Sequence, residues 1–380
     1  MSSTELPKRD LKEIVVCSLE LWDEVWRRNQ FFAHHLLVRN PELRILFVEP
    51  PADPIHDVAN RRRPAAPSAR PIGYDSRLIG FRPLKAFPRR LGPLSDALLR
   101  LQVRSAARAF GLRRPLLWLN DVTYAPLIST TGWPTVYDVT DDWLLAPFPK
   151  RELERLTALD ALAMRRSVEV AVCSPSLERH RGRHRPVTLV SNGVDADHFR
   201  TPQAHPADLP GPPTAVYVGT LHESRLDVAL LVRLGVQRPE LNVVLVGPVA
   251  LGPESLSALA RVPNITLLGM RPYDRVPGYM QHADVLIVPH VVTPFTDSLD
   301  PIKAYEYMVA GKPVVATPVA GFREQSNRFA IAAGEAFVDA VAKAVGSVGK
   351  AGTVPSWEER AGAFESVLRQ ALRGASGPAH

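Results

Sequence analysis

The sequence predicts an α/β protein of two domains, each built on a mainly parallel sheet. Short, nearly continuous apolar runs alternate with longer segments of helical spacing along most of the chain. This alternation is interrupted by a polar, proline-rich stretch at residues 201–213 and then begins again. Such short apolar runs are typical of strands buried on both faces, and their alternation with helices favours parallel pairing. A chain of 380 residues is long enough for two domains.

The first half of the chain supplies the elements of the first domain. Residues 14–19 form an apolar run, and residues 22–39 follow with the apolar spacing of a helix. The next run, 45–51, stops at two prolines, and the Pro-, Ala- and Arg-rich stretch 52–75 predicts a loop. Further strands are expected at 115–121, 134–142 and 169–174, with helices at 92–110 and 150–166.

The second half repeats the same kind of alternation. We predict an N-terminal Rossmann-like domain over 1–200, a second over 201–355, and a C-terminal helix within 356–380 that returns to the first domain. Two such domains facing each other across a cleft would bind ligands at the carboxyl ends of their strands. In the second domain, strands are expected at 214–219, 242–247, 265–269, 284–289 and 312–317, with helices at 224–237, 253–261, 275–282 and 301–310.

The composition is that of a soluble globular protein, with 46% hydrophobic and 22% charged residues. No stretch approaches the roughly 18 to 20 apolar residues that a membrane span needs, and the N-terminus lacks the apolar core of a signal peptide. The two cysteines, Cys17 and Cys173, are too few for a disulfide framework or a cysteine-rich zinc site. We therefore expect a cytoplasmic protein.

Positive charge is concentrated in one segment of the chain. Residues 59–114 hold fourteen basic side chains but only Asp75 and Asp96, whereas the whole chain carries a net charge of +7. Such asymmetry predicts a face that meets an anionic partner, and an anionic membrane surface is one candidate. The alternative is a solvated, arginine-rich surface. We do not expect nucleic acid, because no DNA- or RNA-binding motif accompanies the charge.

Two segments of the second domain have features suited to a diphosphate. The expected strand 214–219 ends at Gly219, and a short loop with Arg225 leads to a helix, whose first N–H groups would suit a phosphate. In the second segment, Lys303 and Glu306 lie three residues apart on the same face of a helix, with Lys303 near its start. The lysine could receive a diphosphate and the carboxylate two ribose hydroxyls. The alternatives are an ordinary turn and a surface ion pair.

These segments carry a resemblance to a known family. VSNGVDADHF (190–199), YVGTL (217–221), the stretch 269–289 and the helix that ends in EYMVAGKPVVAT resemble the C-terminal half of family-4-like GT-B glycosyltransferases. The segment WDEVWRRNQFFAHHL, the LFVEPP strand and YDVTDDW are similar to teichuronic-acid-type bacterial glycosyltransferases and, more distantly, to the xanthan glucuronosyltransferase. The resemblance covers about residues 12–325 and implies a GT-B architecture.

The resemblance implies roles for residues of the second domain. Glu306 matches the second glutamate of the family's E-x7-E motif, which binds the ribose, whereas the first glutamate is replaced by Ser298. Lys303 matches a lysine that contacts the diphosphate, and Arg225, in the loop after Gly219, would share that charge. Arg271 lies where the family's backbone reads the nucleotide base. The resemblance implies no metal or other cofactor.

Three carboxylates follow a buried strand of the first domain, in the segment YDVTDDW. A carboxylate at a strand's carboxyl end could remove a proton from an acceptor hydroxyl. By the resemblance Asp141 is the best match to a general base and Asp142 the second. Asp138 is expected on the acceptor side with Trp22 and Asp23, which open the first strand-to-helix turn. Alternatives are a helix cap, a magnesium site at the aspartates, and core packing of the tryptophan.

The sequence as a whole predicts a glycosyltransferase. It would move a sugar from a UDP- or GDP-linked donor to an acceptor hydroxyl on a glycan, a glycolipid or a small molecule, in polysaccharide or cell-envelope synthesis. The basic segment 59–114 would place the enzyme on the inner face of the plasma membrane. Alternatives are a soluble natural-product acceptor, a sugar-nucleotide epimerase, and a non-catalytic sugar-nucleotide-binding subunit of the same fold.

Overall fold

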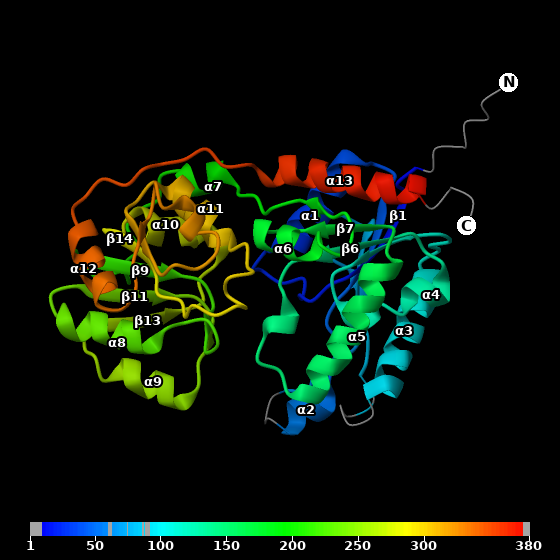
Figure 1. The fold of residues 1–380 in the computed structure, drawn as a ribbon, viewed down its shortest axis with the longest axis horizontal. Coiled ribbons are helices and arrows are strands. Elements are labelled where there is room, and N and C mark those ends of the chain that lie inside the picture. Colours follow the sequence, from blue (N-terminus) through cyan, green and yellow to red (C-terminus); the bar gives the residue numbers. More distant parts are fainter. Residues whose placement is uncertain (1–9, 60–62, 74, 86, 88–91, 375–380) are drawn as a thin grey trace. The chain divides into compact units, whose positions relative to one another are not determined.

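A computed structural model describes residues 10–374 except 60–62, 74, 86 and 88–91. The chain divides into an N-terminal unit, Met1–Ser191 with Glu358–His380, and a C-terminal unit, Asn192–Trp357 (Figure 1). Each unit is an α/β layer structure with its own sheet and core. No helix of the described ranges is both long and apolar enough to cross a bilayer.

The N-terminal unit is built on an eight-stranded sheet in the order β3-β4-β2-β1-β5-β6-β7-β8. Every neighbouring pair is parallel except β3 and β4, which pair antiparallel. From β1 the chain builds outward to one side and then returns to build the other, so the topological switch lies between β1 and β5. The strands are β1 (Glu13–Cys17), β2 (Arg44–Val48), β3 (Ser68–Pro71), β4 (Leu78–Arg82), β5 (Leu116–Leu119), β6 (Thr135–Val139), β7 (Glu169–Val172) and β8 (Thr188–Leu189).

The central strands of this sheet form because their side chains are buried on both faces. All of β5 and β6 is buried, as is all of β1 but its first residue. Such strands alternate with helices that cover the faces. The helices are α1 (Arg28–Arg39), α2 (Pro54–Ala59), α3 (Gly92–Ala109), α4 (Leu127–Thr131), α5 (Lys150–Arg166), α6 (Pro175–Arg181) and α13 (Trp357–Gly374), with short 3-10 turns η2 (Val122–Tyr124) and η3 (Trp143–Leu145).

Helix α1 starts later than the sequence predicts. The apolar spacing suggested a helix from residue 22, but α1 begins at Arg28, because Arg27 is extended and its N–H donates to the Gln30 side chain at 2.8 Å. The Trp22 N–H donates to the Glu49 carboxylate at 2.9 Å, which holds this segment as a loop. The predicted loop 52–75 was also partly wrong, since it contains α2 and β3.

An aromatic cluster joins α1 and α13 to the sheet. The ring of Phe364 lies 5.1 Å from that of Phe32 and 4.7 Å from that of Trp118, centroid to centroid. The Arg28 guanidinium lies 4.4 Å above the Phe32 ring and bonds both oxygens of Asp138 at 3.0 and 3.2 Å. Because Arg28 and Asp138 are almost fully buried, their charges depend on each other.

The C-terminal unit is built on a six-stranded, all-parallel sheet in the order β13-β11-β9-β14-β15-β16, with its switch between β9 and β14. A separate pair, β10 (Leu221–His222) and β12 (Val249–Ala250), extends the loops after β9 and β11. The elements are β9 (Thr214–Val218), β11 (Asn242–Val246), β13 (Ile265–Gly269), β14 (Val285–Val288), β15 (Val314–Ala316), β16 (Ala330–Ile331), α7 (Ala196–Arg200), α8 (Val228–Gln237), α9 (Pro253–Ala260), α10 (Val276–Gln281), α11 (Ile302–Ala310), α12 (Gly334–Ala344) and the 3-10 turns η4 (Tyr273–Arg275) and η5 (Arg323–Gln325).

The buried pair Arg28–Asp138 gives a stability prediction. Arg28→Met leaves the Asp138 carboxylate buried without its counter-charge, so we expect the free energy of unfolding to fall by about 3–5 kcal/mol in urea titrations. Arg27→Met removes partly exposed ion pairs with Asp23 and Glu20 and a hydrogen bond to the Val25 carbonyl, and should cost less, about 1 kcal/mol. The double change Arg28→Met with Asp138→Asn should regain most of the loss. Equal losses for Arg28→Met and Arg27→Met would contradict this account.

Candidate functional site

In the C-terminal unit, a glycine brings a lysine to the carboxyl edge of the sheet. Gly219 follows β9 with a φ of 140°, a conformation that favours glycine. A Cβ atom there would lie 2.5 Å from the Nζ of Lys303, which extends from the first turn of α11. That ammonium donates to the Tyr217 hydroxyl at 2.7 Å and lies 4.0 Å from the centroid of its ring. Gly219, Lys303 and Tyr217 therefore meet at the topological switch of this sheet.

Glu306 lies one turn further along α11 and shares the environment of Lys303. Burial lowers the pKa of Lys303 to about 7, against the opposing effect of Glu306 and with a further lowering by Arg225. Burial likewise raises the pKa of Glu306 to about 7, against the opposing effect of Lys303. Each group therefore loses hydration that its partner only partly replaces. A bound anion near Lys303 would favour its charged form.

A second layer of polar groups supports the lysine. The Tyr217 hydroxyl also bonds Nε2 of His290 at 3.1 Å. Burial, followed by the charges of Lys303 and Arg225, lowers the pKa of His290 well below its usual value, so its ring is neutral at pH 7. Sequence analysis did not identify Tyr217, although a tyrosine within an otherwise aliphatic strand, two residues before a glycine, was a usable signal.

Arg225 belongs to the same group of charges, whereas Arg271 does not. The Arg225 guanidinium lies 5.3 Å from the centroid of the Phe295 ring, and its charge acts on both Lys303 and His290. The Arg271 side chain instead pairs with Asp208, while its Nε donates to the Tyr279 hydroxyl at 3.0 Å. The structure thus brings together four of the five predicted donor residues: Gly219, Arg225, Lys303 and Glu306.

No carboxylate stands at the position of the missing motif glutamate. Ser298 is buried there, and its hydroxyl donates to the Phe295 carbonyl at 2.8 Å. The flanking acids are engaged elsewhere: Asp297 pairs with Arg323, and Asp300 accepts from the Asn192 N–H at 2.7 Å. The departure from the family pattern seen in the sequence is therefore also a departure in structure.

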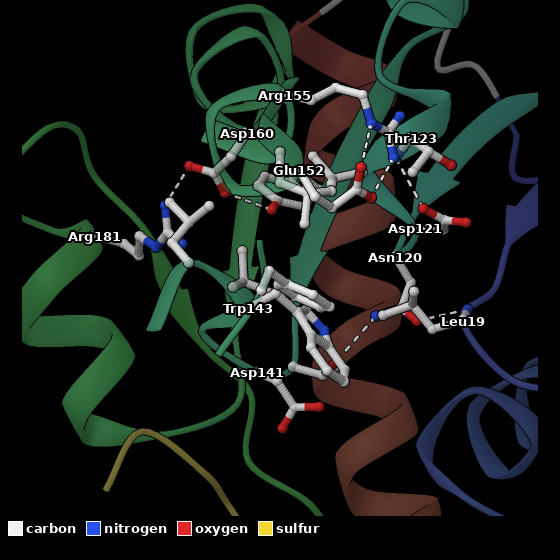
Figure 2. Close-up of a pocket in the computed structure, with 17 residues that line it drawn as sticks. Leu19, Asn120, Asp121, Thr123, Asp141, Trp143, Glu152, Arg155, Asp160 and Arg181 are labelled. Carbon is white, nitrogen blue, oxygen red and sulfur yellow. Dashed lines mark hydrogen bonds and ion pairs between the residues drawn. The ribbon is translucent and has the colours of Figure 1, made fainter. Parts of the chain in front are cut away.

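The N-terminal unit contains a cavity of about 230 Å³ at the carboxyl ends of β1, β5 and β6 (Figure 2). Residues from the loops after these strands, from η2 and η3, and from α5 line it. Asp141 is among the lining residues, but Asp138 and Asp142 are not. Figure 2 shows Trp143 in the middle of this group, with Asp160 and Arg181 to one side.

Asn120 ties the two loops at the polar end of this cavity together. Its Oδ1 accepts from the Leu19 N–H at 3.3 Å, in the loop after β1. Its Nδ2 donates to the Asp138 carbonyl at 3.1 Å and to the Thr140 hydroxyl at 3.2 Å, in the loop after β6. This one side chain therefore fixes the loop that carries Asp141.

The other two predicted aspartates have structural surroundings. Asp138 is fully buried and accepts from Arg28 and, at 3.1 Å, from the Trp118 Nε1–H. Asp142 pairs with the Arg181 guanidinium at 3.1 Å. The sequence predicts Asp138 on the acceptor side, but in β6 its side chain points to the face of the sheet opposite the cavity. We therefore assign Asp138 a role in the stability of the unit.

The remaining acceptor-side predictions lie in the loop after β1. The Trp22 ring packs edge-on against Phe47 at 5.1 Å and Trp26 at 5.6 Å, so the packing alternative describes it. Asp23 accepts from the Val25 N–H at 2.9 Å and pairs with Arg27.

Glu20, in the same loop, was not predicted. Burial raises its pKa to about 7, with smaller contributions from Asp141 and Asp23 that Arg27 opposes. Glu20 and Asp141 thus interact electrostatically at the same edge of the sheet, although neither sequence spacing nor a motif links them.

No group of three or more His, Cys, Asp or Glu side chains in the described ranges is arranged to hold a metal ion. No such cluster among the described residues therefore supports a magnesium site at the aspartate segment. Asp138, Asp141 and Asp142 follow one another in sequence, but they occupy different surroundings.

Comparisons with known proteins show which sequences and structures the chain resembles. Residues 212–347 match the family described as Glycosyl transferases group 1, so the C-terminal unit contains a domain of that kind. The chain is 28% identical over 249 residues to a Bacillus subtilis (strain 168) protein provisionally assigned as the teichuronic acid biosynthesis glycosyltransferase TuaH. That alignment covers 60% of each chain, so the chain spans about 60% of the length of this relative.

Solved structures show that the fold is the GT-B fold of glycosyltransferases. An α,α-trehalose-phosphate synthase (UDP-forming) from Burkholderia vietnamiensis superposes with a TM-score of 0.60 at 15% identity, covering 97% of both chains. Anabaena HepE in complex with UDP and glucose superposes with a TM-score of 0.57 at 15% identity, covering 97% of this chain and 94% of that one. Both domains of the predicted fold class are therefore present.

Proposed function

We propose that the chain is a glycosyltransferase that moves a sugar from a UDP-linked donor to an acceptor hydroxyl. The observation that carries the proposal is the Lys303 ammonium, which Gly219 admits to the carboxyl edge of the C-terminal sheet beside Glu306 and Arg225. This cluster lies within the segment that matches the group 1 family. The UDP-forming synthase and the UDP complex among the structural neighbours support UDP over GDP.

The reaction would proceed by direct displacement. The acceptor oxygen attacks the anomeric carbon, the bond from that carbon to the diphosphate oxygen breaks, and its electron pair leaves with UDP. Lys303 and Arg225 stabilise the charge that develops on the diphosphate, and Glu306 holds the ribose hydroxyls. Asp141 accepts the proton from the acceptor hydroxyl. This scheme inverts the anomeric carbon and uses no metal.

The acceptor proposal is a glycan or glycolipid of polysaccharide or cell-envelope synthesis, and the likeness to the assigned teichuronic acid enzyme supports it. A soluble natural product is the alternative acceptor. An epimerase would act on the donor alone, and a non-catalytic subunit would bind it without transfer. A transferase would need Asp141 with either acceptor, whereas an epimerase or a non-catalytic subunit would not.

Nucleotide binding tests the donor site. UDP should raise the thermal midpoint of the chain in EDTA by mass action, and more than GDP, dTDP, ADP or CMP. Lys303→Ala removes a charge-assisted contact to the diphosphate and should weaken UDP about 10- to 100-fold. Lys343→Ala, an exposed lysine on α12, is the matched control and should leave the shift unchanged. The absence of a shift with every nucleotide would refute the donor site.

Transfer kinetics test the base. Asp141→Asn should lower kcat for sugar transfer from UDP-hexose into a membrane glycolipid fraction by about 10²- to 10⁴-fold. The UDP-induced shift should stay, because the donor residues are untouched. Asp142→Asn is the comparison, since Asp142 does not line the cavity and its carboxylate is already paired with Arg181. If only Asp142→Asn lowers kcat, the base is Asp142 and not Asp141. Full activity of both variants would favour a reaction on the donor alone.

We also propose peripheral binding to anionic membranes through the basic segment 59–114. Within it, Arg77 pairs with Asp75 and Lys85 with Asp53, so these two cations are already neutralised. Arg104 and Arg108 are one turn apart on α3 and are the better candidates. The members Arg61, Arg62, Arg89 and Arg90 lie outside the described residues.

Liposome flotation tests this surface. Each basic residue near an anionic surface contributes about 1 kcal/mol, so Arg104→Glu with Arg108→Glu should abolish binding at low salt. The exposed Arg183→Glu is the matched control and should bind like the wild type. Binding should also fall as salt rises. Flotation that is absent, or equally strong in high salt, would remove the membrane proposal.

A further inference from the structure

The cavity of the N-terminal unit has walls made largely of hydrocarbon. Apolar side chains reach it from the strand β6, from both 3-10 turns and from α5, at the edge where Asp141 lies (Figure 2). Burial of apolar ligand surface against such walls is favourable by about 25 cal/mol for each Å² removed from water. The walls that matter here are Val122, Val139, Trp143, Leu144, Phe148 and Leu156.

The polar side chains around the cavity already bond to one another. Asp160 accepts from the Tyr137 hydroxyl at 2.7 Å and pairs with Arg181. Arg155 donates to Glu152 at 2.8 Å and also pairs with Asp96. A hydroxyl-rich sugar ring in this space would compete with these internal bonds, and each polar group left without a partner costs about 1–3 kcal/mol.

The Asp121 side chain at this edge is engaged in the same way. It accepts from the Thr123 N–H at 2.8 Å at the start of η2, and burial raises its pKa. The polar side chains around the cavity therefore hold its walls in place through bonds to one another. The space that they enclose suits an apolar group.

Charge makes the cavity unfavourable for an anion. Four carboxylates line it, whereas only two guanidinium groups do, and each of these is held by carboxylates: Arg155 by Glu152 and Asp96, and Arg181 by Asp160 and Asp142. A phosphate or uronate in this cavity would meet net negative charge, and both guanidinium groups that could bind it are already paired with carboxylates. Like charges placed together in a desolvated site are costly.

The size and shape limit the ligand further. A cavity of about 150 Å³ holds benzene, so a volume of about 230 Å³ suits one or two fused rings rather than a long chain. The rings of Trp143 and Phe148, tilted by 37° with centroids 6.2 Å apart, offer aromatic surface. Offset and edge-on ring contacts add about 0.5–1.5 kcal/mol to the burial of area.

We propose that this cavity binds an uncharged aromatic group of the acceptor and presents its hydroxyl to Asp141. The inference rests on the proposed function, because it names the acceptor class that Asp141 would serve. Of the acceptors considered above, the inference favours a molecule that carries an aromatic group over a polysaccharide end that has none.

Calorimetric titration of the nucleotide-free full chain with three probes tests the inference. 2-Naphthol should bind with a negative heat-capacity change, the signature of apolar burial. 2-Naphthyl phosphate, which has the same rings and an anionic group, should bind at least about 10-fold more weakly because of the carboxylates. Methyl α-glucoside should not bind measurably. Tighter binding of the phosphate or the glucoside than of 2-naphthol would overturn the proposal.

A matched pair of variants locates the binding. Leu144→Trp fills the cavity and should weaken 2-naphthol at least about 10-fold, whereas Leu145→Trp changes the neighbouring exposed residue, which does not line the cavity. Unchanged binding in a folded Leu144→Trp protein would overturn the assignment. If Leu144→Trp does not fold, the three-probe titration of the wild type still decides. UDP-induced shifts, measured separately, would show failure of the donor site without affecting this result.

Discussion

The partly buried ammonium of Lys303 is the constraint on which the C-terminal site depends. It reaches its position only because Gly219 has no Cβ atom, and Gly247, at the end of the neighbouring strand, packs equally closely against the Gly219 carbonyl. Burial opposes the charge on both Lys303 and Glu306 and moves their pKa values toward each other. A diphosphate would supply the anion that this site lacks, so the ligand completes an electrostatic arrangement that the protein alone leaves costly.

The N-terminal unit solves the opposite problem. Its buried Arg28 and Asp138 already partner each other, and this pair and the Asn120 bonds fix the loop after β6 from within the unit. A loop held in this way can present Asp141 at a defined place without using Asp141 itself for support. This arrangement explains why two of the three aspartates in the segment have structural surroundings and only one lines the cavity.

The sequence predicts most of the fold because the central strands are buried on both faces and give continuous apolar runs. It fails where burial is partial: β3 and β4 carry exposed or half-buried residues, and the turn before α1 has helical spacing without helical backbone. In the site, motif spacing identified Lys303 and Glu306. It did not identify Tyr217, which lies 86 positions from its lysine, or Glu20, whose pKa depends in part on Asp141 in the distant loop after β6.

The two sites also separate ligands by charge. Cations gather around Lys303 in the C-terminal unit, whereas carboxylates outnumber cations around the cavity of the N-terminal unit. Specificity is a difference between two binding free energies, so repulsion at the wrong site serves it as well as attraction at the right one. Under the proposed function, a nucleotide diphosphate would be attracted to the first site and repelled from the second. The cavity proposed for the acceptor would therefore stay open to an uncharged ligand even when the donor is abundant, which a transfer reaction with two substrates requires.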